Sequence, residues 1–287
     1  MDFEEFKDRV VKEIRKYLPE RYEKAHVKLD TVRKLGSGYT GLSVYFDGQE
    51  AAATASLNMY FDAYRAGASF EEIMRSIAEI AMMEPPEVNN DLLDYSKVKD
   101  DLFIRLSNLE SNRRLMDNIP CRTVEDMIVT YHVCTKKGKG DMWCAMVTED
   151  MRKAWNITEE QLFNDALESG EKNFPALLKP LGQLIGNPEA APGMLVLTTM
   201  TKVNGACALL YPGLLQEAAE MLGGDVYILP ASVHEMIIVP AADDVDPESL
   251  ARTVRYVNIS QIPPKDRLSN SIYHYDLKSG RFETALS

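Results

Sequence analysis

The chain has 287 residues, of which 45% are hydrophobic and 26% charged, and its formal net charge is −12. These proportions are typical of a folded globular protein and exclude a fibre or a disordered chain. The acidic balance argues against direct binding to nucleic acid or to an anionic membrane, because both are themselves negatively charged.

The chain begins with an amphipathic pattern. Apolar residues recur at steps of three and four over residues 3–18, which predicts a helix, and Pro19 helps to end it. Residues 27–35 then alternate between apolar and polar side chains, as a half-buried strand does.

The stretch LGSGYTG, residues 35–41, has the G-x-G-x-x-G spacing of a dinucleotide-binding turn, and Asp62 follows about twenty positions later. In such a fold the glycine turn opens a helix whose N–H groups hold a pyrophosphate. Here residues 42–46 alternate as a second strand, and Asp62 falls in a helical stretch, residues 59–66. We therefore predict a hairpin whose loop glycines adopt positive φ, and no cofactor.

The rest of the first part is mainly helical in pattern. Residues 51–57 have the composition of a third strand, and Ser69 with Glu72 forms a capping box before a further helix. Pro85-Pro86 interrupts the chain, and residues 91–109 are predicted to be helical. We place the end of a first part, residues 1–110, at this point.

Residues 111–287 are predicted to form a larger part with shorter elements. Strands are expected at residues 125–133, 142–147, 194–201, 206–210, 226–229 and 236–239, with a small hairpin at 271–282. Helices are expected after Thr158 and at residues 213–222 and 247–256, and the proline-rich residues 175–193 are interpreted as a linker with a short helix at best. Asn204-Gly205 is typical of a type I′ hairpin turn. The fold class predicted is α+β, with antiparallel sheets covered by helices in two parts.

The cysteines and histidines do not form a usual metal motif. The four cysteines, at positions 121, 134, 144 and 207, include no C-x-x-C pair. His132, Cys134 and Cys144 could face each other across a hairpin, but their spacing matches no usual zinc pattern, so we predict no metal. Without a basic, apolar start or a long apolar run, a cytoplasmic protein with reduced thiols and no membrane span is expected.

The loop between two predicted strands holds the best candidates for chemistry: Ser232, His234 and Glu235. The pair His234-Glu235 lacks the second histidine that a zinc protease needs, because position 238 is Ile. No G-x-S-x-G elbow surrounds Ser232. We interpret the segment as a tight loop whose polar side chains satisfy backbone groups, and keep a hydrolase site as the alternative.

Two further patterns remain open. Residues 120–129 and 230–239 share Pro, Glu, Ile and Val at an offset of 110, either as a duplicated strand–loop–strand unit or by coincidence. Residues 225–250 contain six acidic residues and no Lys or Arg. This segment is either a solvated acidic surface or a patch for a basic partner, such as a decoy of a nucleic-acid-binding protein.

Several segments resemble a known family. They are SLNMYFDAYRAGASFEEIM, NRRLMDNIPCRTVEDMIV, WNITEEQLFNDALESGEKNFP, GACALLYPGLLQEAAEMLGGDVYILPASVHEMIIVP and RLSNSIYHYD. Together they resemble the Gram-positive bacterial family known as domain of unknown function 5688. The resemblance implies a bacterial cytoplasmic setting and brings no activity, cofactor or catalytic residue. It makes residues 229–235 the first place to look, with Ala231 where the family commonly has a second serine.

No complete catalytic or cofactor motif emerges from these residues. The function predicted is therefore a non-enzymatic binding or interaction protein whose partner is another protein. The alternatives are a hydrolase centred on residues 230–235 and an acidic decoy.

Overall fold

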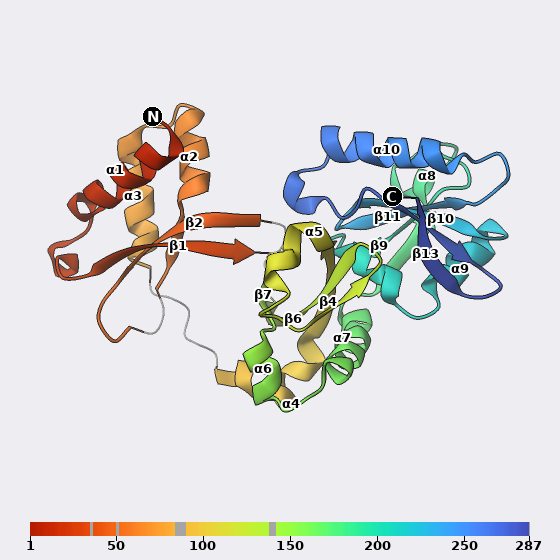
Figure 1. Ribbon diagram of the computed structural model, residues 1–287, viewed down its shortest axis with the longest axis horizontal. Coiled ribbons are helices and arrows are strands. Elements are labelled where there is room, and N and C mark those ends of the chain that lie inside the picture. Colours follow the sequence, from red (N-terminus) through yellow and green to blue (C-terminus); the bar gives the residue numbers. More distant parts are fainter. Residues whose placement is uncertain (35–36, 50–51, 84–89, 138–141, 287) are drawn as a thin grey trace. The chain divides into compact units, whose positions relative to one another are not determined.

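The computed structural model describes residues 1–34, 37–49, 52–83, 90–137 and 142–286. The chain divides into two compact units, Met1–Asn89 and Asn90–Ser287, here called unit 1 and unit 2 (Figure 1). Both combine helices with antiparallel sheets, which confirms the predicted α+β class. Within the described ranges, no helix is long and apolar enough to cross a membrane.

Unit 1 is a three-stranded sheet, in the order β1-β2-β3, packed with helices. The capping box of Asp2 with Glu5 starts α1, and Phe6 and Val10 bury its apolar face completely. In chain order the elements are α1 (Phe3–Glu13), the 3-10 helices η1 (Ile14–Tyr17) and η2 (Glu20–Tyr22), β1 (His26–Lys34), β2 (Ser37–Tyr45), β3 (Thr54–Ser56), α2 (Leu57–Arg65) and α3 (Phe70–Ala81).

The glycine stretch joins β1 to β2 as an antiparallel hairpin, as predicted, with Lys34 opposite Ser37. The expected positive φ is wrong for Gly38 and Gly41, because both lie inside β2 in extended backbone. A Cβ on Gly41 would overlap the Thr54 side chain of β3, so this glycine permits the close approach of two strands. Gly36 lies outside the described residues. Asp62 lies within α2, as predicted.

Unit 2 begins with short helices and a four-stranded sheet. Its centre is β6 (Met127–Lys137), which pairs with β4 (Leu102–Asn108) on one side and with β5 (Cys121–Val124) and β7 (Met142–Met146) on the other. The helices are η3 (Asn90–Leu93), α4 (Tyr95–Val98), η4 (Lys99–Asp101), α5 (Leu109–Asn112), η5 (Arg113–Leu115), α6 (Glu149–Ala154) and α7 (Glu159–Asn173).

The predicted helix at residues 91–109 is therefore wrong over its second half. Helical structure ends at η4, and the apolar residues of β4 are buried on both faces of its sheet, which masks the alternation expected of a half-buried strand. Because β4 belongs to the four-stranded sheet, residues 90–110 are part of unit 2, whereas the sequence placed the division between the two parts near residue 110.

The second sheet of unit 2 has six strands in the order β13-β12-β10-β11-β9-β8. They are β8 (Ala176–Pro180), β9 (Leu195–Thr199), β10 (Val226–Ser232), β11 (Glu235–Pro240), β12 (Ile272–Asp276) and β13 (Arg281–Leu286). The associated helices are α8 (Leu181–Leu184), η6 (Gly205–Leu210), α9 (Leu214–Leu222), α10 (Pro247–Ser260) and η7 (Pro264–Asp266).

Two predictions in this region are wrong. Residues 175–193 contain the short helix α8 that the linker interpretation allowed, but they also contribute the edge strand β8, which it did not predict. Residues 206–210, expected to return as a strand, form the 3-10 helix η6. All residues of η6 except Leu210 are buried, so continuous apolar sequence here reflects burial rather than strand structure.

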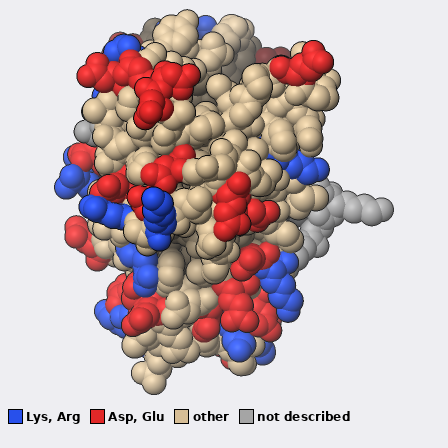
Figure 2. All heavy atoms as spheres, turned by 90° about the vertical axis from the view of Figure 1, so that its right-hand side faces the viewer, with Lys and Arg blue, Asp and Glu red and all other residues tan. Residues whose placement is uncertain are grey.

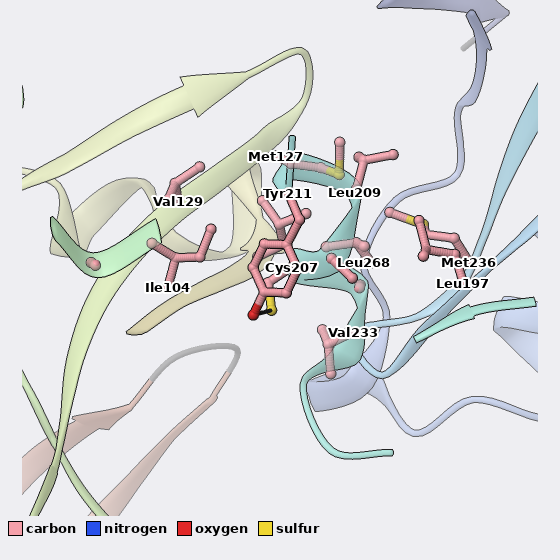
Figure 3. Close-up of a cluster of buried hydrophobic side chains, with 14 of the residues drawn as sticks. Ile104, Met127, Val129, Leu197, Cys207, Leu209, Tyr211, Val233, Met236 and Leu268 are labelled. Atoms are coloured by element: carbon pink, nitrogen blue, oxygen red, sulfur yellow. Dashed lines mark hydrogen bonds between the residues drawn. The ribbon is translucent and has the colours of Figure 1, made fainter. Parts of the chain in front are cut away.

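The largest core lies between the two sheets of unit 2 (Figure 3). Ile104, Met127 and Val129 come from the four-stranded sheet, whereas Leu197 and Met236 come from the six-stranded sheet. Residues of η6 fill the space between them. The 3-10 helix η6 therefore packs between the two sheets, a contact that the sequence alone does not predict.

Candidate functional site

The segment with the candidate residues is a tight turn between two strands. β10 and β11 pair as far as Ser232 opposite Glu235, so only Val233 and His234 form the turn. The predicted loop over residues 230–235 is thus shorter than expected, and Ser232 and Glu235 are strand-end residues. Pro230 lies beyond Ile228, the last residue of β10 that pairs with β12, which suits a residue without an N–H group.

Ser232 is turned toward the backbone. Ser232 is only 7% exposed, and its Oγ accepts a hydrogen bond from the His234 backbone N–H at 3.0 Å. This is a local bond across the turn of the kind that serine side chains commonly make. The hydroxyl therefore stabilises the turn directly.

The His234 ring contacts two segments distant in sequence. Nδ1 accepts a hydrogen bond from the Asn204 backbone N–H at 3.0 Å, and Nε2 lies 3.7 Å from Asp266 Oδ1. The bond to Asn204 requires an unprotonated Nδ1, so the neutral ring carries its proton on Nε2, toward the carboxylate. Neither ring nitrogen bonds the Ser232 hydroxyl. A nucleophile–base pair needs that bond, so these two described side chains do not form such a pair in this arrangement.

The backbone of the turn also makes hydrogen bonds to residues distant in sequence. Thr198 Oγ1 donates to the His234 carbonyl at 2.7 Å. The Val233 carbonyl accepts a hydrogen bond from the Ala206 N–H, and the Val233 N–H donates to the Asp266 carbonyl. A Cβ on Gly205 would overlap Thr198 Oγ1 and lie 2.6 Å from the His234 carbonyl oxygen. Gly205 is therefore required for close packing, rather than for the hairpin turn that the Asn-Gly pair predicts.

Sequence reasoning missed the partners Thr198, Asn204, Gly205 and Asp266. Their only signal was the turn-prone pair Asn204-Gly205, which was interpreted in the wrong context. The turn brings together β9, η6, β10 and η7, and this convergence depends on tertiary structure. The arrangement supports the loop-holding interpretation of Ser232 and His234, while a role for Glu235 stays a prediction.

A second polar cluster joins the two sheets of unit 2. Asp126, in the turn between β5 and β6, accepts hydrogen bonds from Ser269 at 2.6 Å, from Ser271 at 3.0 Å and from the Tyr273 hydroxyl. The three donors are almost fully buried, and burial raises the pKa of Tyr273, which keeps its hydroxyl protonated as a donor. The sequence did not single out this cluster.

The internal echo does not place equivalent residues at equivalent positions. Glu125 lies in the turn between β5 and β6, with φ of 54°, whereas Glu235 is the first residue of β11. Relative to the repeated residues, the turn between β10 and β11 begins two positions earlier than the turn between β5 and β6. The two turns also belong to different sheets. This displacement favours coincidence over duplication.

His132, Cys134 and Cys144 lie on the four-stranded sheet. Cys134 and Cys144 are directly opposite each other, while His132 Nε2 lies 3.0 Å from Thr130 Oγ1. Burial, and then the charge of Arg105, hold the pKa of His132 well below its usual value. Among the residues that the structure describes, no group of three or more His, Cys, Asp or Glu side chains could hold a metal ion.

The acidic stretch at residues 225–250 has several structural partners. Asp246 caps α10 and lies 3.3 Å from Arg252, while Asp225 accepts a bond from the Leu277 N–H at 3.0 Å. On the face shown in Figure 2, acidic and basic side chains are interspersed. These contacts support the solvated-surface interpretation, and the decoy hypothesis stays a prediction.

Comparison with known proteins gives one match. No curated protein and no solved structure matches the chain. The model of the family of unknown function DUF5688 matches residues 3–277, which include the Val233–His234 turn and the Asp126 cluster. The chain belongs to the family of unknown function DUF5688.

Proposed function

We propose that this chain is a binding protein that acts through contact with another protein, in the cytoplasm of a bacterium. The observation that carries the proposal is the outward face of α10. Tyr256 and Ile259, less than one helical turn apart, are 69% and 75% exposed. Single exposed apolar residues are common, but a large pair on one helix face is typical of an interaction surface.

The exposed surface of α10 continues into the residues that follow the helix, and hydrogen bonds hold their backbone in place. Pro263 and Pro264 are also exposed. Arg267 donates to the carbonyls of Ile262 at 2.9 Å and Ile259 at 3.4 Å, which fixes the chain after α10. A surface that is already ordered loses less conformational entropy when a partner binds.

The inner face of α10 explains why these residues point outward. Ala251 and Val254 pack on Leu229, Val239 and Ile272 of the six-stranded sheet. Residues at the opposite spacing, including Tyr256 and Ile259, then face away from the sheet. The helix covers that sheet in Figure 1.

The charges beside the apolar pair indicate the kind of partner. Arg252 is paired with Asp246 and Glu248, whereas Arg255 and Lys265 are exposed beside the surface. In a chain with net charge −12, this is a locally basic border. We infer a partner protein that presents apolar side chains flanked by carboxylates.

The pocket between η4 and α7 lacks the size and lining of a typical small-molecule site. Its volume is about 90 Å³, whereas sites for small molecules commonly enclose several hundred. It is lined by Lys99, Asp100, Asp165, Glu168, Ser169 and Lys172. These side chains are mainly charged, so the pocket also lacks the apolar walls of such sites.

The test compares two surface variants by quantitative cross-linking and mass spectrometry in the native cell. Tyr256→Ser with Ile259→Ser should remove a specific acidic partner, while Ile185→Ser with Met221→Ser, at other exposed apolar positions of unit 2, should retain it. Equal recovery with both variants would contradict the proposal. Self-association of the wild type that is lost in the first variant would show instead that a second copy is the occupant.

A further inference from the structure

Cys134 and Cys144 face each other directly across the ladder between β6 and β7. Cys134 is buried and Cys144 is partly buried, and both pack with Phe103 and Phe174. The remaining cysteines lack such a partner. Cys121 lies opposite Thr130, and Cys207 lies 3.9 Å from the Tyr211 hydroxyl.

We propose that Cys134 and Cys144 are a redox modification site, at which a peroxide converts the two thiols into a reversible intramolecular disulfide. Directly opposed residues of an antiparallel pair have Cα atoms about 4.5–5.5 Å apart. A disulfide accepts Cα separations of about 4.4–6.8 Å. The Cα separation therefore permits the bond, and only a local approach of β6 and β7 is needed.

The same geometry makes the bond easy to reduce. Opposed Cβ atoms are about 4.5–5.5 Å apart in a sheet, whereas a disulfide prefers about 3.5–4.5 Å. Bond formation must draw β6 and β7 together, and the irregular register between Cys134 and Lys136 lets β6 adjust. Strained disulfides have more oxidising potentials and are the regulatory kind.

The oxidation proceeds in two balanced steps. The Cys144 thiolate attacks one oxygen of hydrogen peroxide, so that an S–O bond forms, the O–O bond breaks and hydroxide leaves as water after taking a proton. The Cys134 sulfur then attacks the sulfenic sulfur of Cys144, the S–S bond forms and a second water leaves. Two thiols and one peroxide give one disulfide and two waters.

Arg105 of β4 assists the first step. Burial raises the pKa of the Cys144 thiol, but the guanidinium of Arg105 opposes this rise because it stabilises the thiolate. The Arg105 Nε is buried and has no hydrogen-bond partner in the described part of the chain. Burial also raises the pKa of Cys207, to about 11, and Arg105 opposes that rise as well. Geometry distinguishes the two thiols, because Cys144 lies directly opposite Cys134.

The test uses the full-length protein, reduced and then titrated with hydrogen peroxide. Free thiols are blocked with N-ethylmaleimide in denaturant, and intact mass and peptide mapping follow. We expect Cys134 and Cys144 to lose reactivity together, with the loss of two hydrogens and one linked peptide pair, and dithiothreitol should restore both thiols. A bond to Cys121 or Cys207, a bond between chains, or independent oxidation of the two thiols would overturn the proposal.

Two variants provide the controls. With Cys134→Ala, Cys144 should accumulate as a sulfenic acid that dimedone traps, because the second thiol is missing. With Cys121→Ala and Cys207→Ala combined, the linked pair should still form. The mapping of the wild-type chain decides the question even where a variant fails to fold.

Discussion

At the residue scale, the Val233–His234 turn shows how a few polar groups fix the meeting point of several elements. The Asn204 N–H, the Thr198 hydroxyl and the Ser232 hydroxyl each have one specific partner at the turn. A buried polar group that loses its partner costs about 1–3 kcal/mol. The turn residues are therefore expected to affect stability first.

The first prediction concerns Gly205→Ala. The added Cβ would meet the Thr198 hydroxyl and the His234 carbonyl, neither of which can move without disrupting β9 or the turn. We expect the free energy of unfolding of unit 2 to fall by roughly 3 kcal/mol. Gly224→Ala is the matched control, because nothing lies within 4 Å of its Cβ. Equal effects of the two changes would refute the close-packing role.

The second prediction concerns His234→Ala. Loss of the ring leaves the Asn204 N–H without an acceptor, so the free energy of unfolding should fall by about 1–3 kcal/mol, while the α10 surface should still bind its partner. Combined with Ser232→Ala, the coupling should be below about 0.5 kcal/mol, because Ser232 bonds the backbone N–H that the alanine retains. An unchanged melting temperature with lost binding would instead favour a functional site.

At the element scale, β6 shows why one strand carries so many buried polar residues. It is the central strand of its sheet, and alternate residues on one of its faces are Thr130, His132 and Cys134. Their exposed fractions are 0%, 3% and 5%. A histidine in this position stays neutral because burial penalises the imidazolium.

The third prediction is a pH dependence that originates at His132. Its pKa is lower in the folded chain than in the unfolded chain, so its contribution to stability is present above about pH 6.5 and is lost as the pH falls below that value. The loss should reach about 1.4 kcal/mol per pH unit. The difference in unfolding free energy between wild type and His132→Asn should therefore shrink from pH 7.5 to pH 5.

Urea unfolding followed by tryptophan fluorescence makes this measurement, because both tryptophans, at positions 143 and 155, belong to unit 2. A constant difference between wild type and His132→Asn across this pH range would show that His132 does not remain neutral.

At the scale of the whole molecule, the two units have separate hydrophobic cores. The core of unit 1 draws on buried residues from Phe6 to Ala81. The cores of unit 2 draw on buried residues from Val98 to Tyr275. Each unit therefore buries apolar surface of its own, which is the physical requirement for independent folding.

The fourth prediction follows from these separate cores. Residues 90–287 expressed alone should keep the tryptophan spectrum of the full chain and its urea midpoint for unit 2. The variant Leu197→Ala should lower that midpoint equally in both proteins, because Leu197 is fully buried in the unit 2 core. An unfolded fragment, or a shifted midpoint, would show that unit 2 depends on unit 1.

The sequence by itself determined the elements whose signals are local. The capping box at Ser69, the hairpin around residues 35–41 and the α+β class follow from caps, alternation and turn residues, which act between near neighbours. The presence of a polar turn near Ser232 and His234 was equally visible. Local patterns of this kind predict the folded structure because the tertiary contacts of these elements are compatible with them.

Only the tertiary structure decided the rest. The apolar residues of β4 and η6 are compatible with either a helix or a strand. Burial between the two sheets decided that β4 is a strand and η6 a 3-10 helix, and no local pattern reveals this burial. The partners of His234 come from residues 204 and 266. The sequence indicated that Cys134 and Cys144 could face each other across a hairpin, but only the register of β6 and β7 decided that they are directly opposite. Such contacts depend on chain pairing over long distances, whose stabilisation appears only once the sheets have formed.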